Sequence, residues 1–355
     1  MSYKIFTINP GSSSLKVALF EDDTPVFTVS RRHTPEELAP FATVHDQRHF
    51  RLDAILKIAE EQGLDLSTID AFAARAGFCR PLTGGTYAIN AALLDDVIHC
   101  RYGEHASNIS SVCADMLSKR YGKPAYVTDP VSVDEFRPEA YVTGVPGLRR
   151  VSRFHALNQK AVARVIAERC GKRYEEANVV VAHLGGGVSV GAHRKGRVVD
   201  ACSPAEEGPM SIDRPGNLPN MGLVDLCYST PDRESLIRRL STGSGVMAYT
   251  GDSDLIRIEE RAEHEPEVAL VLDTLAYQVA FWMLGYLAAF DGEPCDALVL
   301  TGGMAKSDYL VPRIVERLKP YGRVEVVRGE FEMEALAAGA LRVLRGEDTA
   351  KVYGA

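Results

Sequence analysis

Short apolar runs bounded by turn residues predict buried strands that alternate with helices along this chain. A buried strand is a run of four to eight apolar residues, whereas a helix repeats its apolar positions every three to four residues. The predicted strands cover 4–9, 15–20, 24–29, 69–76, 125–129, 178–183, 188–192, 197–201, 297–300 and 323–327. The predicted helices cover 51–62, 105–121, 156–170, 268–290 and 332–344. This alternation predicts α/β layers throughout.

Two segments of the chain follow the same order of strand, small-residue loop, strand, turn and strand. The first copy spans 4–29 around a loop at 10–14, and the second spans 178–201 around glycines 185–187. Few residues are identical between the copies, so the repeat is one of shape. Two similar α/β halves predict a cleft between them, with one phosphate-binding loop on each side.

The length of 355 residues also favours two domains. We place the N-terminal domain at 1–150 and the C-terminal domain at 151–330. The final segment, about 331–355, is expected to pack back on the N-terminal domain.

Composition narrows the possible partners. The chain is 46% hydrophobic and carries a net charge of -8, with its charges spread without long blocks. No basic footprint for nucleic acid or for a membrane surface is visible, so we expect neither partner. Asp273, Gln278 and Gly285 interrupt the apolar stretch at 268–290, which favours a buried or interface helix over a membrane span.

The seven cysteines are widely spaced and form no C-x-x-C pair. A disulfide framework or a structural zinc site is therefore not expected, and a reducing compartment is. The N-terminus leads directly into a strand and shows no signal peptide. Both observations predict a cytoplasmic protein.

The loop after the first strand is a candidate phosphate site. Gly11 allows close approach of the backbone, and the hydroxyls of Ser12, Ser13 and Ser14 with the turn N–H groups can face one anion. Lys16 on the following strand can add a positive charge. The alternative is an ordinary hairpin turn, because Pro, Gly and Ser favour turns for conformational reasons alone.

Two further glycine loops stand at strand ends. They contain Gly185, Gly186 and Gly187, and Gly302 and Gly303. None has the P-loop spacing, and no G-x-G-x-x-G motif opens a helix after a strand. Together with the first loop they predict contacts to one polyphosphate, whereas the alternative is a set of unrelated turns in a chain with 30 glycines.

Several charged residues are candidates for the chemistry. Asp129 ends a strand, where ligands of α/β sheets bind, although Asp-Pro is also common in turns. His155 starts a helix and can donate toward an anion, or can simply cap and pack. Arg75, Arg80 and Arg214 lie in glycine-rich turns, which suits binding of a carboxylate or phosphate, although most arginines are solvated.

Three glutamates, Glu330, Glu332 and Glu334, lie at the start of the last predicted helix. One of them could serve Mg²⁺, which takes one or two carboxylates together with phosphate oxygens. The alternative is the favourable interaction of acidic residues with a helix N-terminus.

Taken in order, these motifs resemble the acetate and butyrate kinases, acyl-phosphate-forming members of the actin, hexokinase and Hsp70-like superfamily. The resemblance covers nearly the whole chain. Its pieces are Asn9–Lys16, Arg80-Pro81 with Gly84–Tyr87, Gly103–Asn108, Phe154–Lys160, Ala182–Gly187, Gly191–Arg197, Thr301–Gly303 and Glu332–Leu336. The resemblance implies two actin-like (ribonuclease H-like) domains, each a mixed sheet flanked by helices, with an active-site cleft between them.

Within that family the chain looks more like butyrate kinase than acetate kinase. Acetate kinases are longer and carry an asparagine where Gly186 stands. The stretches at 103–108, 154–160 and 191–197 point the same way. The implied reaction is reversible transfer of the γ-phosphoryl group of ATP to a short-chain carboxylate, with butanoate as the expected acceptor. Acetate, propionate and isobutyrate are alternatives, and a sugar kinase or an ATP-driven binding protein of the same superfamily is a more distant one.

The resemblance also implies roles for individual residues. Asp129, His155 and Arg214 are the implied catalytic residues, with Asp129 expected to position the metal rather than to accept a proton. The implied carboxylate-binding residue is Arg75 or Arg80. Mg²⁺ is implied to be held by Asn9 and Glu332. The implied nucleotide contacts are Ser12, Ser13, Ser14, Lys16, His183, Gly185, Gly186, Gly187, Gly302 and Gly303.

Two further expectations follow from the resemblance. Members of the family are generally at least dimeric, and the apolar helix at 268–290 fits a homo-oligomer. One loop departs from the family pattern, because Asp254-Leu255-Ile256-Arg257 has one residue more than the usual Asp-x-Arg. Nucleotide contacts from this loop are therefore in doubt, although the chemistry is not.

Overall fold

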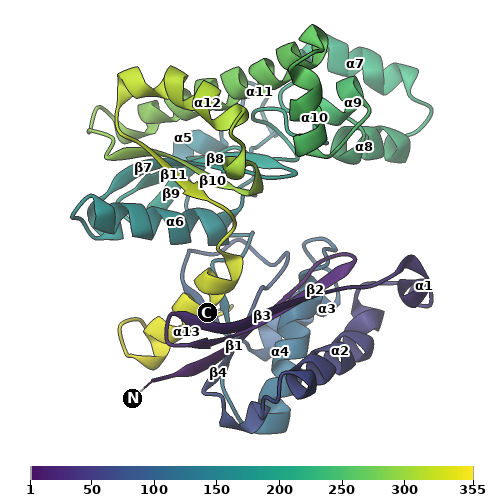
Figure 1. Ribbon diagram of the computed structural model, residues 1–355, viewed down its shortest axis with the longest axis vertical. Coiled ribbons are helices and arrows are strands. Elements are labelled where there is room, and N and C mark those ends of the chain that lie inside the picture. Colours follow the sequence, from purple (N-terminus) through teal and green to yellow (C-terminus); the bar gives the residue numbers. More distant parts are fainter. Residues whose placement is uncertain (1, 355) are drawn as a thin grey trace. The chain divides into compact units, whose positions relative to one another are not determined.

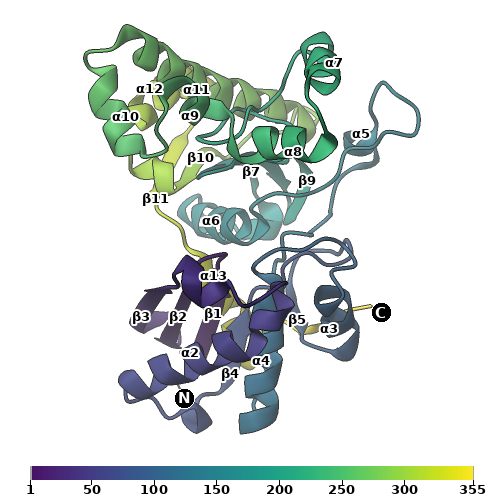
Figure 2. The same ribbon diagram turned by 90° about the vertical axis from the view of Figure 1, so that its right-hand side faces the viewer.

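The computed structural model describes residues 2–354 and is a mixed α/β structure with two sheets flanked by helices (Figures 1 and 2). The chain divides into two compact units. The first unit contains the residues up to Asp134 together with those from Phe331 onward, and the second contains Glu135–Glu330.

The first unit contains a seven-stranded sheet in the order β12-β5-β6-β4-β1-β2-β3. Its strands are β1 (Lys4–Pro10), β2 (Ser14–Glu21), β3 (Thr24–Arg32), β4 (Ala71–Ala74), β5 (Thr86–Ala88), β6 (Ala125–Thr128) and β12 (Lys351–Val352). Strands β1, β2 and β3 form an antiparallel meander, whereas β1, β4 and β6 run parallel.

Helices cover both faces of this first sheet. The helices of this unit are α1 (Pro35–Leu38), α2 (Arg48–Glu61), α3 (Ala91–Ile98), α4 (Asn108–Tyr121) and α13 (Glu332–Leu344). Helices α4 and α13 both contact β1, β4 and β6, and Figure 1 shows them on opposite faces. The approach of α13 is close because Gly339 has no side chain: a Cβ there would lie 2.1 Å from Oγ1 of Thr128.

The second unit contains a five-stranded sheet in the order β11-β10-β7-β8-β9. Its strands are β7 (Asn178–Leu184), β8 (Val188–Arg194), β9 (Arg197–Ala201), β10 (Ala297–Gly302) and β11 (Val324–Arg328). Its helices are α5 (Pro138–Tyr141), α6 (Ala156–Arg169), α7 (Asn220–Ser229), α8 (Arg233–Thr242), α9 (Gly245–Thr250), α10 (Leu255–Ala262), α11 (Pro266–Gly285) and α12 (Leu310–Leu318). Helix α6 lies on one face of the sheet, and α11 and α12 lie on the other (Figure 1).

The repeat of shape predicted from the sequence is present in the topology. The order β3-β2-β1-β4-β6 in the first sheet corresponds strand for strand to β9-β8-β7-β10-β11 in the second. In both sheets an antiparallel meander is followed by two parallel strands. The carboxyl ends of three parallel strands therefore meet at one edge of each sheet, which is where α/β proteins bind ligands.

The boundary between the units lies at Asp134 rather than near residue 150. The carboxylate of Glu135 pairs with Nζ of Lys160 at 2.8 Å and accepts from the backbone of Val198. Arg150 pairs with Asp200 at 2.9 Å. These bonds attach 135–150 to the second unit, and ion pairs between residues far apart in sequence leave no mark on the local apolar pattern.

Helix α11 with the turn at Tyr286–Phe290 is long and apolar enough to cross a membrane by length and composition. One face of it packs into the core of the second unit through Val268, Leu272, Leu275, Ala276, Val279, Ala280 and Met283. The opposite face exposes Leu270, Tyr277 and Phe281. This helix is thus a core element with one apolar face uncovered.

Candidate functional site

A cluster of polar side chains forms where β1, β4 and α13 meet in the first unit. Nδ2 of Asn9 donates to Oε2 of Glu332 at 2.7 Å, and Nη1 of Arg75 lies 3.0 Å from Oε1 of the same carboxylate. Asn9 lies near the end of β1, Arg75 directly follows β4, and Glu332 opens α13. The parallel pairing of β1 and β4 brings Asn9 and Arg75 to one edge of the sheet, and the packing of α13 on these strands brings Glu332 to both, 323 positions from Asn9.

Lys16 belongs to the same end of the sheet. It is the cross-strand partner of Asn9 in the β1–β2 ladder, and partners in an antiparallel pair point to the same face. The turn between them is a hairpin closed by a hydrogen bond from Gly11 N–H to the Ser14 carbonyl at 2.9 Å, with Ser12 and Ser13 exposed at its tip. The loop is thus a hairpin turn, and it also exposes the hydroxyls of Ser12 and Ser13.

One residue that was not anticipated from the sequence, Arg51 of α2, holds this turn. Its guanidinium donates to the carbonyls of Ser14 at 2.7 Å, Ser12 at 2.8 Å and Gly11 at 3.2 Å. The side chain is 1% exposed, and burial lowers its pKa. A buried cation that satisfies three carbonyls of one turn fixes the path of that backbone.

Asp129 follows β6 with a positive φ of 39°, an unusual backbone conformation for a residue with a side chain. Its Oδ1 accepts from Gly85 N–H at 2.7 Å, and its own N–H donates to the Gly85 carbonyl at 3.0 Å. The 83–86 loop therefore fixes the carboxylate at the carboxyl end of the third parallel strand.

Arg75 and Arg80 belong to different clusters. Arg80 contacts Asp96 at 3.4 Å, stacks over the ring of Tyr353, and donates its backbone N–H to the Tyr353 hydroxyl. The same hydroxyl donates to Asp96 at 2.7 Å. This arrangement ties α3 and the C-terminal segment to the 75–80 loop, whereas Arg75 faces the Asn9–Glu332 pair.

The first unit fits Mg²⁺ only as part of a metal–phosphate complex. Among residues 2–354 no group of three or more His, Cys, Asp and Glu side chains could hold a metal ion. Glu332 supplies one carboxylate, and the Asn9 amide that donates to it through Nδ2 also carries an oxygen. Mg²⁺ commonly takes one or two carboxylates and completes its shell with water and substrate phosphate oxygens, so this donor set is sufficient for it.

In the second unit, His155 and His183 stack on each other. Their ring centroids are 3.9 Å apart and the planes differ by 16°. His155 is the N-cap residue of α6, and His183 lies one residue before the end of β7. Nδ1 of His155 lies 2.7 Å from Oγ of Ser189, and Nδ1 of His183 lies 2.9 Å from Nδ2 of Asn158.

The glycine loops allow other groups to approach closely. A Cβ on Gly187 would lie 2.6 Å from Nη1 of Arg214, and one on Gly185 would lie 3.0 Å from Nε2 of His183. Gly302 has a φ of 97°, and a Cβ there would lie 2.4 Å from the Leu184 carbonyl. The 185–187 loop therefore contacts both a predicted catalytic arginine and one of the stacked imidazoles.

The Arg214 loop is held by the start of α9. The N–H groups of Ser244, Val246 and Met247 donate to the carbonyls of residues 213, 211 and 212, respectively. Gly245 has a φ of 66° and fits directly under the loop. Nε of Arg214 is buried and has no hydrogen-bond partner among the residues that the structure describes. An unsatisfied buried donor beside a glycine loop suits binding of an anion.

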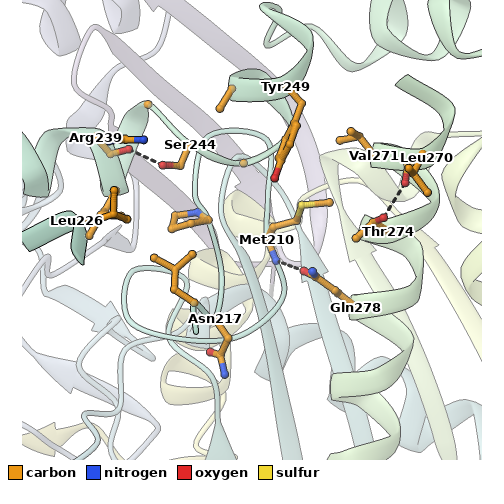
Figure 3. Close-up of a pocket in the computed structure, with 16 residues that line it drawn as sticks. Met210, Asn217, Leu226, Arg239, Ser244, Tyr249, Leu270, Val271, Thr274 and Gln278 are labelled. Atoms are coloured by element: carbon orange, nitrogen blue, oxygen red, sulfur yellow. Dashed lines mark hydrogen bonds between the residues drawn. The ribbon is translucent and has the colours of Figure 1, made fainter. Parts of the chain in front are cut away.

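A cavity of about 560 Å³ adjoins this loop at Pro215 and the start of α9 at Ser244 and Gly245. Figure 3 shows residues that line it. Met210, Asn217 and Tyr249 line it, and Gln278 Oε1 accepts from Met210 N–H at 2.8 Å. None of the predicted site residues lines this cavity.

The Asp254–Arg257 loop, which departs from the family pattern, makes hydrogen bonds and ion pairs within itself and with Asp252. Asp254 accepts from Ile256 N–H and caps α10, and Arg257 pairs with Asp252 at 2.7 Å and with Asp254 at 3.1 Å.

Comparison with known proteins places the chain in a family. The model of the acetokinase family matches residues 138–331, more than half of the chain. Porphyromonas gingivalis acetate kinase superimposes with a TM-score of 0.78 at 19% identity, covering 96% of this chain and 100% of that one. A propionate kinase from Francisella tularensis subsp. tularensis SCHU S4 gives 0.76 at 17%, covering 95% and 98%. Acetate kinase from Entamoeba histolytica gives 0.74 at 16%, covering 95% and 98%. At these identities the superpositions show a shared fold.

Proposed function

The chain belongs to the acetokinase family and is a phosphotransferase with a carboxyl group as acceptor, and we propose that its acceptor is butyrate. The reaction proposed is butanoate + ATP ⇌ butanoyl phosphate + ADP. The polar clusters described above in each unit are the observations that support this proposal.

The nucleophile needs no general base. A carboxylic acid with a pKa of about 4 is already ionised at neutral pH. Catalysis then consists of positioning the reactants and stabilising the charge of a loose phosphoryl transition state. This chemistry requires cations and N–H donors on the phosphoryl oxygens rather than a proton acceptor.

We assign the acceptor carboxylate to Arg75. Its guanidinium is already oriented by Glu332, whereas the Arg80 guanidinium is engaged by Asp96 and Tyr353. Asn9, Glu332 and Asp129 are the residues that would hold Mg²⁺, directly or through water. Held there, Mg²⁺ would supply positive charge that neutralises the phosphates.

We assign the phosphoryl group to the second unit. Nε of Arg214 is buried and makes no hydrogen bond in the described chain, with a carboxylate oxygen of Asp213 at 3.8 Å, and this single observation best supports an anion site there. The loop at Gly185–Gly187 gives an anion access to the backbone, and His155 supplies a ring N–H. The nucleotide loops at Ser12–Ser14, Lys16, His183 and Gly302-Gly303 complete the proposal.

The choice of butyrate is supported by what packs against the Arg75 loop. Phe78 lies three residues after Arg75, and its ring contacts His105 with centroids 5.3 Å apart. Phe78 N–H donates to Asn108 Oδ1 at 3.0 Å, and a Cβ on Gly103 would lie 3.2 Å from the Phe78 ring. The stretch 103–108, one of those that resemble butyrate kinase, thus holds an aromatic side chain three residues after the proposed carboxylate-binding arginine.

The test is a coupled assay of ADP release with Mg²⁺-ATP and straight or branched carboxylates of two to five carbons. Hydroxylamine trapping confirms that the product is an acyl phosphate and separates this reaction from transfer to a sugar hydroxyl. We expect kcat/KM for butyrate to exceed that for acetate about tenfold or more, since each methylene contributes about 1–3 kcal/mol to discrimination. A preference for acetate, propionate or isobutyrate would refute butyrate while leaving the carboxylate kinase intact.

A pair of phenylalanine variants probes the alkyl contact. Phe78→Ala should lower kcat/KM for butyrate more than for acetate, because only the longer chain loses apolar contact. Phe41→Ala removes a ring that packs against Phe50 in the same unit, and it should affect both acids equally. Equal losses in Phe78→Ala would contradict the assignment.

We also propose a cytoplasmic homo-oligomer. The exposed Leu270, Tyr277 and Phe281 lie on one face of α11, and a second copy of the chain would cover them. Light scattering after size exclusion should give a multiple of the chain mass of 38.7 kDa, and Phe281→Glu should reduce it. A monomeric wild-type protein would contradict the proposal.

A further inference from the structure

We infer that two separate hydrogen-bond chains hold His155 and His183 as neutral rings that both carry their proton on Nε2. Ser189 and Gln159 position the first ring, and Asn158 with Thr301 positions the second. The inference deepens the proposed function, because it rests on His155 contacting the transferring phosphoryl group.

The first chain starts at a backbone carbonyl. Nε2 of Gln159 donates to the carbonyl of Ser189 at 3.1 Å. A carbonyl can only accept, so this contact fixes the amide group of Gln159 with its NH₂ toward Ser189. The second hydrogen of that NH₂ then points to Oγ of Ser189 at 2.9 Å.

The orientation of the Gln159 amide determines where the hydroxyl hydrogen of Ser189 points, and it points to His155. The hydroxyl oxygen of Ser189 accepts from Gln159 and also from the backbone N–H of His155 at 3.4 Å. These two bonds occupy both lone pairs of the oxygen, so the hydroxyl hydrogen is directed to Nδ1 of His155 at 2.7 Å. Nδ1 is then an acceptor, and the single ring proton of His155 lies on Nε2.

The other end of the first hydrogen-bond chain, at His193, is consistent with this orientation of the Gln159 amide. Oε1 of Gln159 faces Nε2 of His193 at 3.1 Å, so His193 must carry a proton there. Nδ1 of His193 in turn accepts from the Tyr174 hydroxyl at 2.9 Å. Complete burial lowers the pKa of His193 well below its usual value, which keeps this ring neutral with one N–H.

The second chain also starts at a backbone carbonyl. The hydroxyl of Thr301 donates to the Gly329 carbonyl at 3.2 Å, so its oxygen is left to accept from Nδ2 of Asn158 at 3.3 Å. The same NH₂ group lies 2.9 Å from Nδ1 of His183. Nδ1 of His183 is therefore an acceptor, and its proton also lies on Nε2.

The glycine at position 191 supports a specific role for Gln159. A Cβ there would lie 2.5 Å from Oε1 of Gln159, so β8 leaves space for this amide to reach His193. Gln159, Ser189 and His193 are fully buried, and the buried amide and hydroxyl are satisfied within the chain. Such a network is costly to leave incomplete, which makes it rigid.

The consequence is a pair of stacked neutral imidazoles, each with one Nε2–H donor. Neither ring can accept a proton at Nδ1 without breaking its bond to Ser189 or Asn158. Both can therefore donate to anionic oxygens but cannot serve as general bases. This behaviour matches a reaction whose nucleophile is already ionised.

Nitrogen-15 NMR of the histidine rings tests the tautomers in the wild-type protein without substrate. We expect the Nδ1 signals of His155 and His183 at the shift of an unprotonated ring nitrogen, and their Nε2 signals at that of a protonated one. A protonated Nδ1 on either ring would overturn the inference for that ring.

Variants test whether the chain positions His155. Ser189→Ala removes the donor to Nδ1 and should give mixed tautomers of His155, with kcat about tenfold lower and KM for ATP little changed. Gln159→Glu places an acceptor where Ser189 now meets a donor, which should turn the hydroxyl away from His155 and move the His155 proton to Nδ1. Ser111→Ala, which removes another fully buried serine hydroxyl from α4, is the matched control and should leave the His155 signals unchanged.

The outcomes separate this inference from the proposed function. If wild-type protein makes no acyl phosphate, the function is refuted, whereas the NMR result still decides the tautomers. If Ser189→Ala leaves the His155 signals as in wild type, the positioning role of Ser189 is wrong even when the protein is an active kinase. If it lowers kcat only as much as Ser111→Ala does, the hydroxyl contributes packing alone.

Discussion

Replacing Arg51 by methionine should loosen the turn that we assign to the nucleotide. Arg51 reaches from α2 to three carbonyls of the hairpin at Gly11–Ser14, and its Nε also donates to Gln47 at 3.0 Å. Methionine has a similar length and helix propensity, so the helix itself should be preserved. The variant therefore removes the donors and little else.

The magnitude follows from the partners that remain. A hydrogen bond to a charged group contributes about 1.5–3 kcal/mol, and four are lost. Water can replace the guanidinium at the exposed Ser12, and the Ser14 carbonyl still accepts from Gly11 N–H. Burial also lowers the pKa of Arg51, because the charged guanidinium is less favourable in the protein interior than in water. We therefore expect the free energy of unfolding to fall by about 3 kcal/mol, close to two such bonds rather than four.

Urea unfolding and ATP kinetics measure the two effects. The midpoint should fall with an unchanged slope, and kcat/KM for ATP should fall about tenfold under conditions where the variant is folded. Lys57→Met is the matched control, because it removes an exposed cation from the same helix. If Arg51→Met matched Lys57→Met in stability and in kcat/KM for ATP, the reasoning about the turn would be refuted.

Three further predictions concern other parts of the site. Arg75→Ala should lower kcat/KM for butyrate about 10- to 100-fold, as expected when a charged hydrogen bond is lost. Arg80→Ala should mainly lower the free energy of unfolding. Equal losses of kcat/KM in the two variants would contradict the assignment of the carboxylate to Arg75. Gly187→Ala would place a Cβ 2.6 Å from Nη1 of Arg214, so kcat should fall at least tenfold with little change in melting temperature. A variant with the kcat of the wild-type protein would show that Arg214 is not needed in its present position. Burial lowers the pKa of His193, so below about pH 6.5 the unfolded chain binds one more proton at this residue than the folded chain does. The free energy of unfolding should therefore fall by about 1 kcal/mol between pH 7 and pH 5.5 because of His193. His193→Gln should make the dependence of this free energy on pH less steep.

The local pattern of the sequence was sufficient for the elements that carry the site. Strands at 4–9, 15–20 and 178–183 and the helix at 332–344 lie where the apolar runs predict them. Buried strands and periodic helices are recorded in consecutive residues, so a single sequence reveals them. The short strand β5 and the helices at 220–262 were not predicted, although α10 has a clear amphipathic pattern.

The groups that hold the site were harder to find. Arg51 lies on an ordinary helix surface by sequence, and its three carbonyl partners are 37 to 40 residues away. Ser189 was detectable only as a polar residue between two valines of β8. Gln159 fell within a motif that resembles the family, but nothing local indicated its bonds to Ser189 and His193. Long-range hydrogen bonds leave no period in the sequence.

The sequence by itself determined the α/β class, the repeat of shape and the residue types suited to phosphoryl transfer, because each depends on neighbouring residues. Only the tertiary structure decided which residues meet. It joined Asn9 to Glu332 across 323 positions, and it separated Arg75 from Arg80 although they are five residues apart. The physical reason is that strand pairing and the packing of α13 on the sheet bring residues to one edge whatever the length of chain between them.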